Sequence, residues 1–139
     1  MATLSAHHVG LTVSDLEGAL AFYRDVLDLT VVDRFSVGGE AFSDAVGLEE
    51  ASADFAHLDA DGVRIELVSY DPEAQSVPTT ELNQPGAKHV SLSVDDLDAF
   101  YASLADDVST ISEPRTTESG TSILFLRDPG GNLIEILES

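Results

Sequence analysis

The sequence predicts an α+β fold made of two βαβββ modules, and two internal matches indicate the duplication. Residues 8–17, HVGLTVSDLE, and residues 89–98, HVSLSVDDLD, are identical at six of ten positions and are separated by a constant offset of 81. Residues 62–67, GVRIEL, match residues 131–136, GNLIEI, at an offset of 69. Two motifs that recur in the same order indicate a repeated structural unit.

The length of 139 residues suits one domain, here built from two modules that share a core. We expect a single domain over residues 1–139, with module one at about 4–70 and module two at about 88–138. We expect a linker between the modules at about 71–87, because this stretch is rich in proline, which breaks regular structure. The linker contains three prolines: Pro72, Pro78 and Pro85.

Each module opens with a strand and a helix. Residues 8–13 and 89–94 alternate small or polar side chains with Val and Leu, which is the period of a half-buried strand. Residues 14–17, SDLE, then form the start of a helix of capping-box type, and residues 95–98, DDLD, are their copy. The apolar residues that follow at helical spacing are expected in the core.

Three further strands complete each module. Those of module one are predicted at 29–37, 52–59 and 63–70, with Asp61-Gly62 as the tight turn of a hairpin. Those of module two are predicted at 108–112, 121–127 and 132–137, with residues 128–131 as the turn. The segment Gly38–Glu50 is Gly-rich at its start, and it is read either as a surface connection or as a mobile loop over the site.

Composition restricts the partners. The chain has 26 acidic residues against 6 Lys and Arg, a formal charge of −20 and a sequence pI of about 4.1. Such a field repels phosphate and anionic lipid, so nucleic acid and membrane surfaces are not expected as partners. Self-repulsion of this size is best tolerated where salt screens it, and we therefore expect the salt-rich cytoplasm of a haloarchaeon.

The cysteine content and the N-terminal segment exclude further classes of site and of location. The chain contains no cysteine, which excludes disulfides, thiolate metal sites and a cysteine nucleophile. The N-terminal segment MATLSAHHVG has no basic stretch followed by an apolar run, and no apolar run approaches about 18 residues. We expect a soluble protein that is not exported.

A histidine opens the first strand of each module and a glutamate lies in its last strand. These four residues are His8, Glu66, His89 and Glu135. If a pseudo-twofold axis relates the modules, two imidazoles and two carboxylates converge on one face. That donor set suits a divalent first-row metal ion such as Zn, Ni, Co or Mn. Small neighbours leave space for a ligand beside it: Gly10, Thr12, Ser91 and Ser93.

The other two histidines have no counterpart in the repeat. We predict that His7 is a neighbour of the site and that His57 is an ordinary strand residue.

At these motifs the chain resembles the vicinal oxygen chelate superfamily, which includes glyoxalase I, methylmalonyl-CoA epimerase, extradiol dioxygenases and bleomycin-resistance proteins. HHVGLTVSDLEGALAFYRDVLDL and KHVSLSVDDLDAFYASL resemble the two module openings, and RIELVSY and FLRDPGGNLIEILE resemble the two glutamate strands. The resemblance covers nearly the whole chain. It implies an open, curved eight-stranded mixed sheet with the helices outside and metal ligands at His8, Glu66, His89 and Glu135.

Within the superfamily the chain looks most like glyoxalase I and its relatives. The resemblance implies a divalent-metal-dependent lyase or isomerase that moves a proton next to a carbonyl of a small, hemithioacetal-like substrate. Either Glu135 or Glu66 would serve as the base, and Glu135 is favoured. Three alternatives stay open: a non-catalytic binding or resistance-type protein, an extradiol-type dioxygenase, and an acyl-CoA epimerase. We also expect a homodimer, because several members build their sites across two chains and pairing covers sheet edges.

Overall fold

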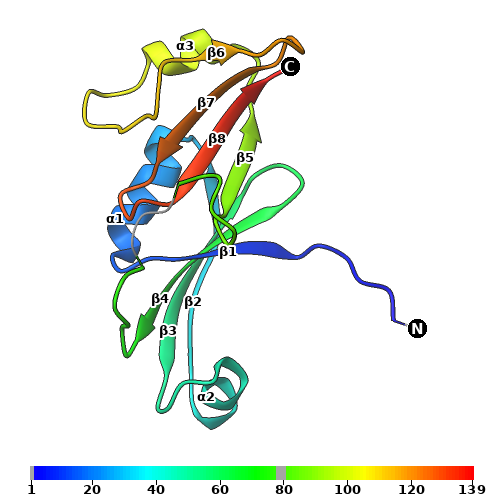
Figure 1. Ribbon diagram of the computed structural model, residues 1–139. Helices are drawn as coiled ribbons and strands as arrows, with labels where there is room; N and C mark the ends of the chain where they lie inside the picture. The colour runs from blue at the N-terminus through cyan, green and yellow to red at the C-terminus, as the bar shows by residue number, and fades with distance from the viewer. Residues whose placement is uncertain (1, 78–80) are drawn as a thin grey trace. The chain divides into compact units, whose positions relative to one another are not determined.

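The computed structural model describes residues 2–77 and 81–139. The chain falls into two compact units, Met1–Ser76 and Val77–Ser139, each with one copy of the repeat (Figure 1). Each unit folds around its own four-stranded mixed sheet. The predicted α+β class and its two strand-rich modules are therefore confirmed. Pro78, one of the predicted linker prolines, lies outside the described residues.

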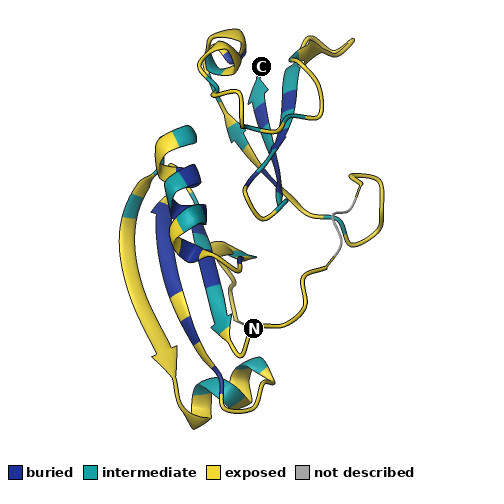
Figure 2. Ribbon diagram, turned by 90° about the vertical axis from the view of Figure 1, so that its left-hand side faces the viewer, coloured by how far each residue is buried: buried dark blue, intermediate teal, exposed yellow. Residues whose placement is uncertain are grey.

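The first unit contains a β-α-β-α-β-β succession. Its elements are β1 (His8–Thr12), α1 (Leu16–Ala21), the π-helical turn η1 (Phe22–Val26), β2 (Thr30–Gly38), α2 (Glu40–Val46), β3 (Ser52–Asp59) and β4 (Arg64–Asp71). The sheet order is β1-β4-β3-β2, with β1 parallel to β4 and the other pairs antiparallel. Helix α1 packs against β3 and β4, and together they bury the apolar core of this unit (Figure 2).

The second unit repeats this plan without a second helix. Its elements are β5 (His89–Ser93), α3 (Leu97–Ala102), β6 (Arg115–Thr116), β7 (Ser122–Arg127) and β8 (Leu133–Glu138). The sheet order β5-β8-β7-β6 matches that of the first unit, and β5 is again parallel to β8. The opening strand of each module thus lies beside its closing strand, although most of the module separates them in sequence.

Both repeated helices have the second residue of the predicted capping segment as their N-cap and begin at the next residue. The Asp15 carboxylate accepts a hydrogen bond from the backbone N–H of Gly18 (3.0 Å), and Asp96 accepts one from Ala99 (3.0 Å). A capping box opening at Ser14 was therefore placed one residue too early. The aspartates also complement the positive end of the helix dipole. Among residues 2–77 and 81–139 no helix is long and apolar enough to cross a membrane.

The segment Gly38–Glu50 is not the loop that its glycines suggested. Its centre is helix α2, which ends at Gly47 in the left-handed conformation (φ 72°). Phe42 packs against Ala53, Phe55 and Val68, so the helix is anchored on the sheet. A hydroxyl also links the helix to the residue just before β3.

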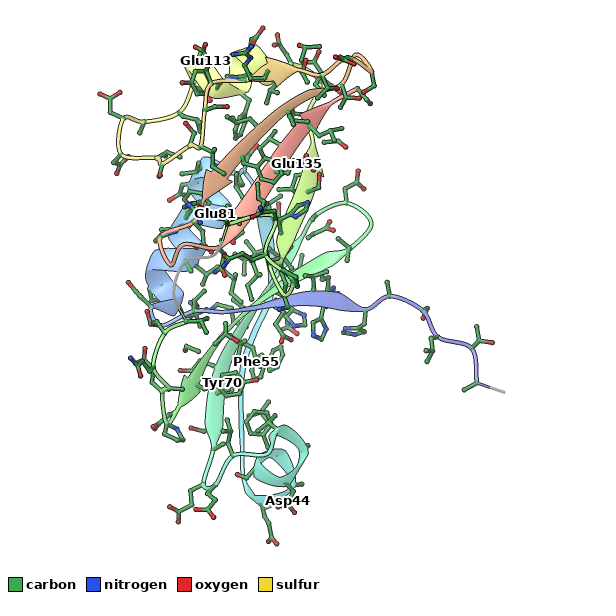
Figure 3. All side chains as sticks on the ribbon, viewed as in Figure 1. Asp44, Phe55, Tyr70, Glu81, Glu113 and Glu135 are labelled. Atoms are coloured by element: carbon green, nitrogen blue, oxygen red, sulfur yellow. The ribbon has the colours of Figure 1, made fainter. Side chains whose placement is uncertain are left out.

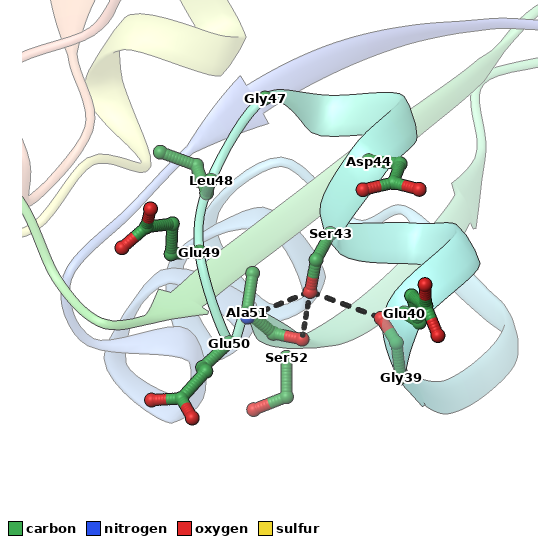
Figure 4. Close-up of a pocket in the computed structure, with 10 residues that line it drawn as sticks. All are labelled: Gly39, Glu40, Ser43, Asp44, Gly47, Leu48, Glu49, Glu50, Ala51 and Ser52. Atoms are coloured by element: carbon green, nitrogen blue, oxygen red, sulfur yellow. Dashed lines mark hydrogen bonds between the residues drawn. The ribbon is translucent and has the colours of Figure 1, made fainter.

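Ser43 makes that link. Its hydroxyl donates to the carbonyl of Gly39 (2.9 Å) and accepts from the backbone N–H of Ala51 (2.9 Å). Ser43 and Ala51 are among the residues that line an open pocket, and acidic residues of α2 and the following turn line it as well (Figure 4). None of the four predicted metal ligands lines this pocket.

The strand predicted at 108–112 does not form as a strand. Thr110 makes a single antiparallel bridge to Leu126, and the fourth strand of the second sheet is instead β6. Pro114 interrupts the segment between that bridge and β6, because proline has no N–H to donate to a ladder.

Candidate metal centre

In the first unit the strand register places His8 beside Glu66. Gly10 of β1 is the direct partner of Glu66 on β4, and His8 lies two residues earlier, on the same face of the sheet. The Nε2 atom of His8 is 3.4 Å from Oε2 of Glu66. The neighbours Ile65 and Leu67 are fully buried on the opposite face. The predicted alternation therefore presents the carboxylate away from the apolar core.

The second unit contains the same pair at the same register. Ser91 of β5 is the partner of Glu135 on β8, and His89 again lies two residues earlier. The Nε2 atom of His89 is 3.9 Å from Oε1 of Glu135, which Figure 3 shows on β8. The side chains of Glu66 and Glu135 are 13% and 15% exposed, so both carboxylates are largely removed from water. The structure brings together His8 with Glu66 and His89 with Glu135, each within its own unit.

The first unit adds a third donor, His57 of β3. It is only 4% exposed, and its Nε2 atom lies 2.8 Å from Oε2 of Glu66. Nitrogen or oxygen atoms of His8, His57 and Glu66 all lie within 4.8 Å of one another. The interpretation of His57 as an ordinary strand residue was wrong, because its side chain contacts a predicted site residue.

The contact between His57 and Glu66 could have been predicted from the position of the hairpin turn. His57 is the fourth residue before the Asp61-Gly62 turn and Glu66 is the fourth after it, so a tight turn there makes them cross-strand partners, as the register shows. Direct cross-strand partners project on the same face. The repeat gives no sign of His57, because the second module has Phe125 at the equivalent position.

His7 lies beside the cluster, as predicted. Its Nδ1 atom is 2.8 Å from Nδ1 of His8, so one of the two rings donates to the other. This contact occupies Nδ1 of His8 and leaves Nε2 to face Glu66. Module two has Lys88 in the equivalent place, and its ammonium donates to the carbonyl of Gly86 (2.9 Å).

An aromatic surface adjoins the cluster. Phe35 of β2 stacks on Phe55 of β3 with ring centroids 4.9 Å apart, and it meets the His57 ring edge-on at 5.3 Å. Phe55 and His57 are two residues apart on one strand, so their side chains share a face. The polar donors therefore have an apolar wall beside them, as a small organic ligand requires.

The donor types fit a divalent metal ion. Imidazole nitrogens and carboxylate oxygens bind first-row metals at about 2.0–2.2 Å, which separates adjacent donors by about 3 Å. The His–Glu separations of 3.4 and 3.9 Å are close to that spacing. Gly10 places no side chain on the other carboxylate oxygen, Oε1 of Glu66, which a Cβ built there would contact at 3.6 Å.

Comparison with known proteins gives a family match along nearly the whole chain. The model of the glyoxalase/bleomycin resistance protein/dioxygenase superfamily matches residues 5–136. This range includes both His–Glu pairs and His57.

Individual relatives agree with this match. Mitochondrial methylmalonyl-CoA epimerase of Mus musculus is 30% identical over 94% of this chain and 70% of its own length. A glyoxalase family protein from Bacillus cereus is 25% identical, with a TM-score of 0.87 over 99% of this chain and 95% of that chain. The trypanothione-dependent glyoxalase I of Leishmania major shares the fold, with a TM-score of 0.65 at 20% identity over 98% of this chain and 87% of that chain.

Proposed function

Because this chain belongs to the glyoxalase/bleomycin resistance/dioxygenase superfamily, we propose that it is a divalent-metal-dependent lyase or isomerase. It moves a proton on the carbon next to a carbonyl group of a small-molecule substrate. The observation that carries this proposal is the His–Glu pair, which recurs at the same strand register in both modules. A protein that only binds an organic ligand has no need of two matched sets of metal donors.

The proposed ligands are His8, Glu66, His89 and Glu135. Each metal site takes both pairs, either from one chain or from two chains of a homodimer, and both arrangements need all four side chains. A bound divalent ion supplies Lewis-acid stabilisation of the negative charge that develops on the substrate oxygen, worth several kcal/mol. Zn, Ni, Co and Mn suit this mixture of nitrogen and oxygen donors.

Glu135 is the proposed base. Proton abstraction next to a carbonyl needs a carboxylate within hydrogen-bond reach of the reacting carbon. Glu135 is partly shielded from water, and its ion-pair contact with His89 is long, at 3.9 Å. A loosely held carboxylate can turn toward the substrate, accept the proton from one carbon and return it to the adjacent carbon.

A hemithioacetal is the first candidate substrate. Return of the proton to the adjacent carbon, together with transfer of the hydroxyl proton to the neighbouring oxygen, converts a hemithioacetal into a hydroxyacyl thioester, which is the glyoxalase I type of isomerisation. The two vicinal oxygens of such a substrate could bind a divalent ion held by these residues. The chain has only six Lys and Arg, so a small or weakly charged thiol fits it better than a polyanionic one.

A thioester epimerisation is the second candidate, and the similarity to methylmalonyl-CoA epimerase favours it. In that reaction a proton leaves one face of the carbon next to the carbonyl and a proton is delivered to the opposite face, which inverts the configuration. The two candidates share proton abstraction by Glu135, but the epimerisation also needs a second proton donor on the opposite face of the carbon.

The test is turnover of both substrate classes by the metal-loaded chain in molar KCl. The probes are the hemithioacetal of methylglyoxal with glutathione and a single epimer of methylmalonyl-CoA. Either isomerisation, lost on Glu135→Gln, supports the proposal. Tight ligand binding that survives metal removal, without turnover, would instead identify a binding protein. Oxygen uptake by the iron-loaded chain with a catechol would identify a dioxygenase.

A further inference from the structure

The two modules differ at the residue directly opposite the glutamate. In module one this residue is His57, the cross-strand partner of Glu66. In module two it is Phe125, the partner of Glu135. The Phe125 ring meets His89 edge-on at 5.3 Å, so one glutamate faces an imidazole donor and the other faces an apolar ring.

Hydrogen bonding defines which His57 nitrogen carries the proton. Arg64 approaches Nδ1 of His57 through its Nη1 atom, at 3.5 Å. The Glu66 carboxylate only accepts, so the ring proton is assigned to the nitrogen that contacts it, Nε2, which leaves Nδ1 to accept from the guanidinium. The Nε2–H group then donates to Oε2 of Glu66 over 2.8 Å. Three side chains form a chain of hydrogen bonds that runs from Arg64 through His57 to the carboxylate.

We propose that His57 is a positioning residue that holds the Glu66 carboxylate in place as a fixed metal ligand. The inference rests on the proposed function. It follows from the 2.8 Å bond, from the burial of His57 and from the absence of an equivalent donor opposite Glu135 among the described residues. The duplicated glutamates thereby take different roles: Glu66 stays in place, and Glu135 moves the proton.

The same geometry opposes a role for His57 as a metal ligand. Nε2 could bind a metal ion only after giving up its proton, and the neutral ring would then carry that proton on Nδ1. Two donors, this N–H and the Arg64 guanidinium, would face each other over 3.5 Å. The hydrogen-bonded tautomer avoids that repulsion and leaves His8 and Glu66 as the donors of this module.

The experiment compares Co²⁺ affinity of the full-length wild type, His57→Phe and His57→Gln by titration in molar KCl. His57→Phe copies the residue that module two accepts at the same register, and His57→Gln keeps an N–H donor. Loss of a hydrogen-bond partner around a metal ligand typically costs about 10–100-fold in metal affinity. We expect His57→Phe to lose Co²⁺ affinity by this factor, and we expect His57→Gln to keep most of the wild-type affinity. Thermal unfolding of the metal-free proteins checks that each variant folds.

Pulsed electron paramagnetic resonance of the Cu²⁺-loaded wild type and His57→Gln counts the bound imidazoles. Two imidazoles in both proteins are expected. Three bound imidazoles in the wild type and two in His57→Gln would show that His57 is a metal ligand, and this result would overturn the inference. Unchanged Co²⁺ affinity in folded His57→Phe, or equal losses in both variants, would overturn it while leaving the proposed function intact. A wild type that binds no metal ion would overturn both.

Discussion

Two glutamates of identical chemistry lie in unlike surroundings. Glu66 accepts a hydrogen bond from a buried histidine and lies 3.4 Å from a second one. Among the described residues, Glu135 has one long histidine contact and an aromatic cross-strand partner. A carboxylate that is fixed by a buried donor loses little freedom when it binds a metal ion, whereas an unsupported one keeps the freedom to change partners.

This difference predicts unequal effects of Glu66→Gln and Glu135→Gln. Glu135→Gln should lower kcat by about 10²–10⁴-fold, because the amide cannot accept the proton. Glu66→Gln should mainly weaken metal binding, because it removes the anionic oxygen that His57 orients. Paired measurements of kcat at saturating metal and of Co²⁺ affinity separate the two effects. If both variants lose metal affinity and kcat to the same extent, the division of roles is wrong.

For single residues, the internal repeat predicted the site residues that occur in both modules, but it did not predict His57, which occurs in one module only. His8 and His89 could be paired from sequence, because each opens an equivalent strand. His57 could not be found by that comparison, because its counterpart is Phe125. Counting outward from the Asp61-Gly62 turn would have found it, since the turn fixes the register of the hairpin.

At the scale of elements, local patterns predicted the strands that carry the site. Strand β3 covers the predicted range 52–59, and β4 and β8 each lie within one residue of their predicted ends. Helix α2 was missed because it is short, and its stability comes from Phe42 packing against residues distant in sequence. The strand predicted at 108–112 is wrong for a different reason. The local sequence pattern favoured a strand there, but Pro114 follows it, and only one bridge forms.

The equivalent helix caps give a prediction at this scale. Asp15→Ala and Asp96→Ala should each lower the free energy of unfolding by about 1 kcal/mol, because each removes the acceptor for a first-turn N–H. Urea unfolding in molar KCl measures the loss.

Asp33→Ala on β2 is the matched control. Asp33 is exposed and lies in a strand, so its removal deletes a negative charge without removing a helix cap. We expect an unchanged or slightly increased stability. A control loss as large as that of the cap variants would mean that charge removal, and not capping, is what the experiment measures.

At the scale of the whole molecule, the net charge of −20 on 139 residues is the dominant feature. We propose that the protein works in concentrated salt, because the screening length falls from about 10 Å at 0.1 M to about 3 Å at 1 M ionic strength. Dilution from molar KCl should therefore lower the thermal unfolding midpoint. Circular dichroism melts across a KCl series measure this, and a midpoint that is independent of salt would contradict the proposal.

The proposed homodimer is also a property of the whole molecule. Strands β1 and β2 form the edges of the first sheet and β5 and β6 those of the second, so each sheet offers edges for pairing. Sedimentation in molar KCl should give a species of twice the chain mass of 14.7 kDa. A monomer at micromolar concentration would place all ligands of each site on one chain.

The metal content of the protein purified in molar KCl, compared between wild type and His89→Ala, tests whether the four proposed ligands bind a metal ion. The four-ligand proposal predicts near-stoichiometric Zn, Ni, Co or Mn in the wild type and its loss in the variant, because His89 is one of two imidazole donors. A wild type that takes up no divalent metal, even when metal is supplied, would contradict the proposal that this chain is a metal-dependent enzyme.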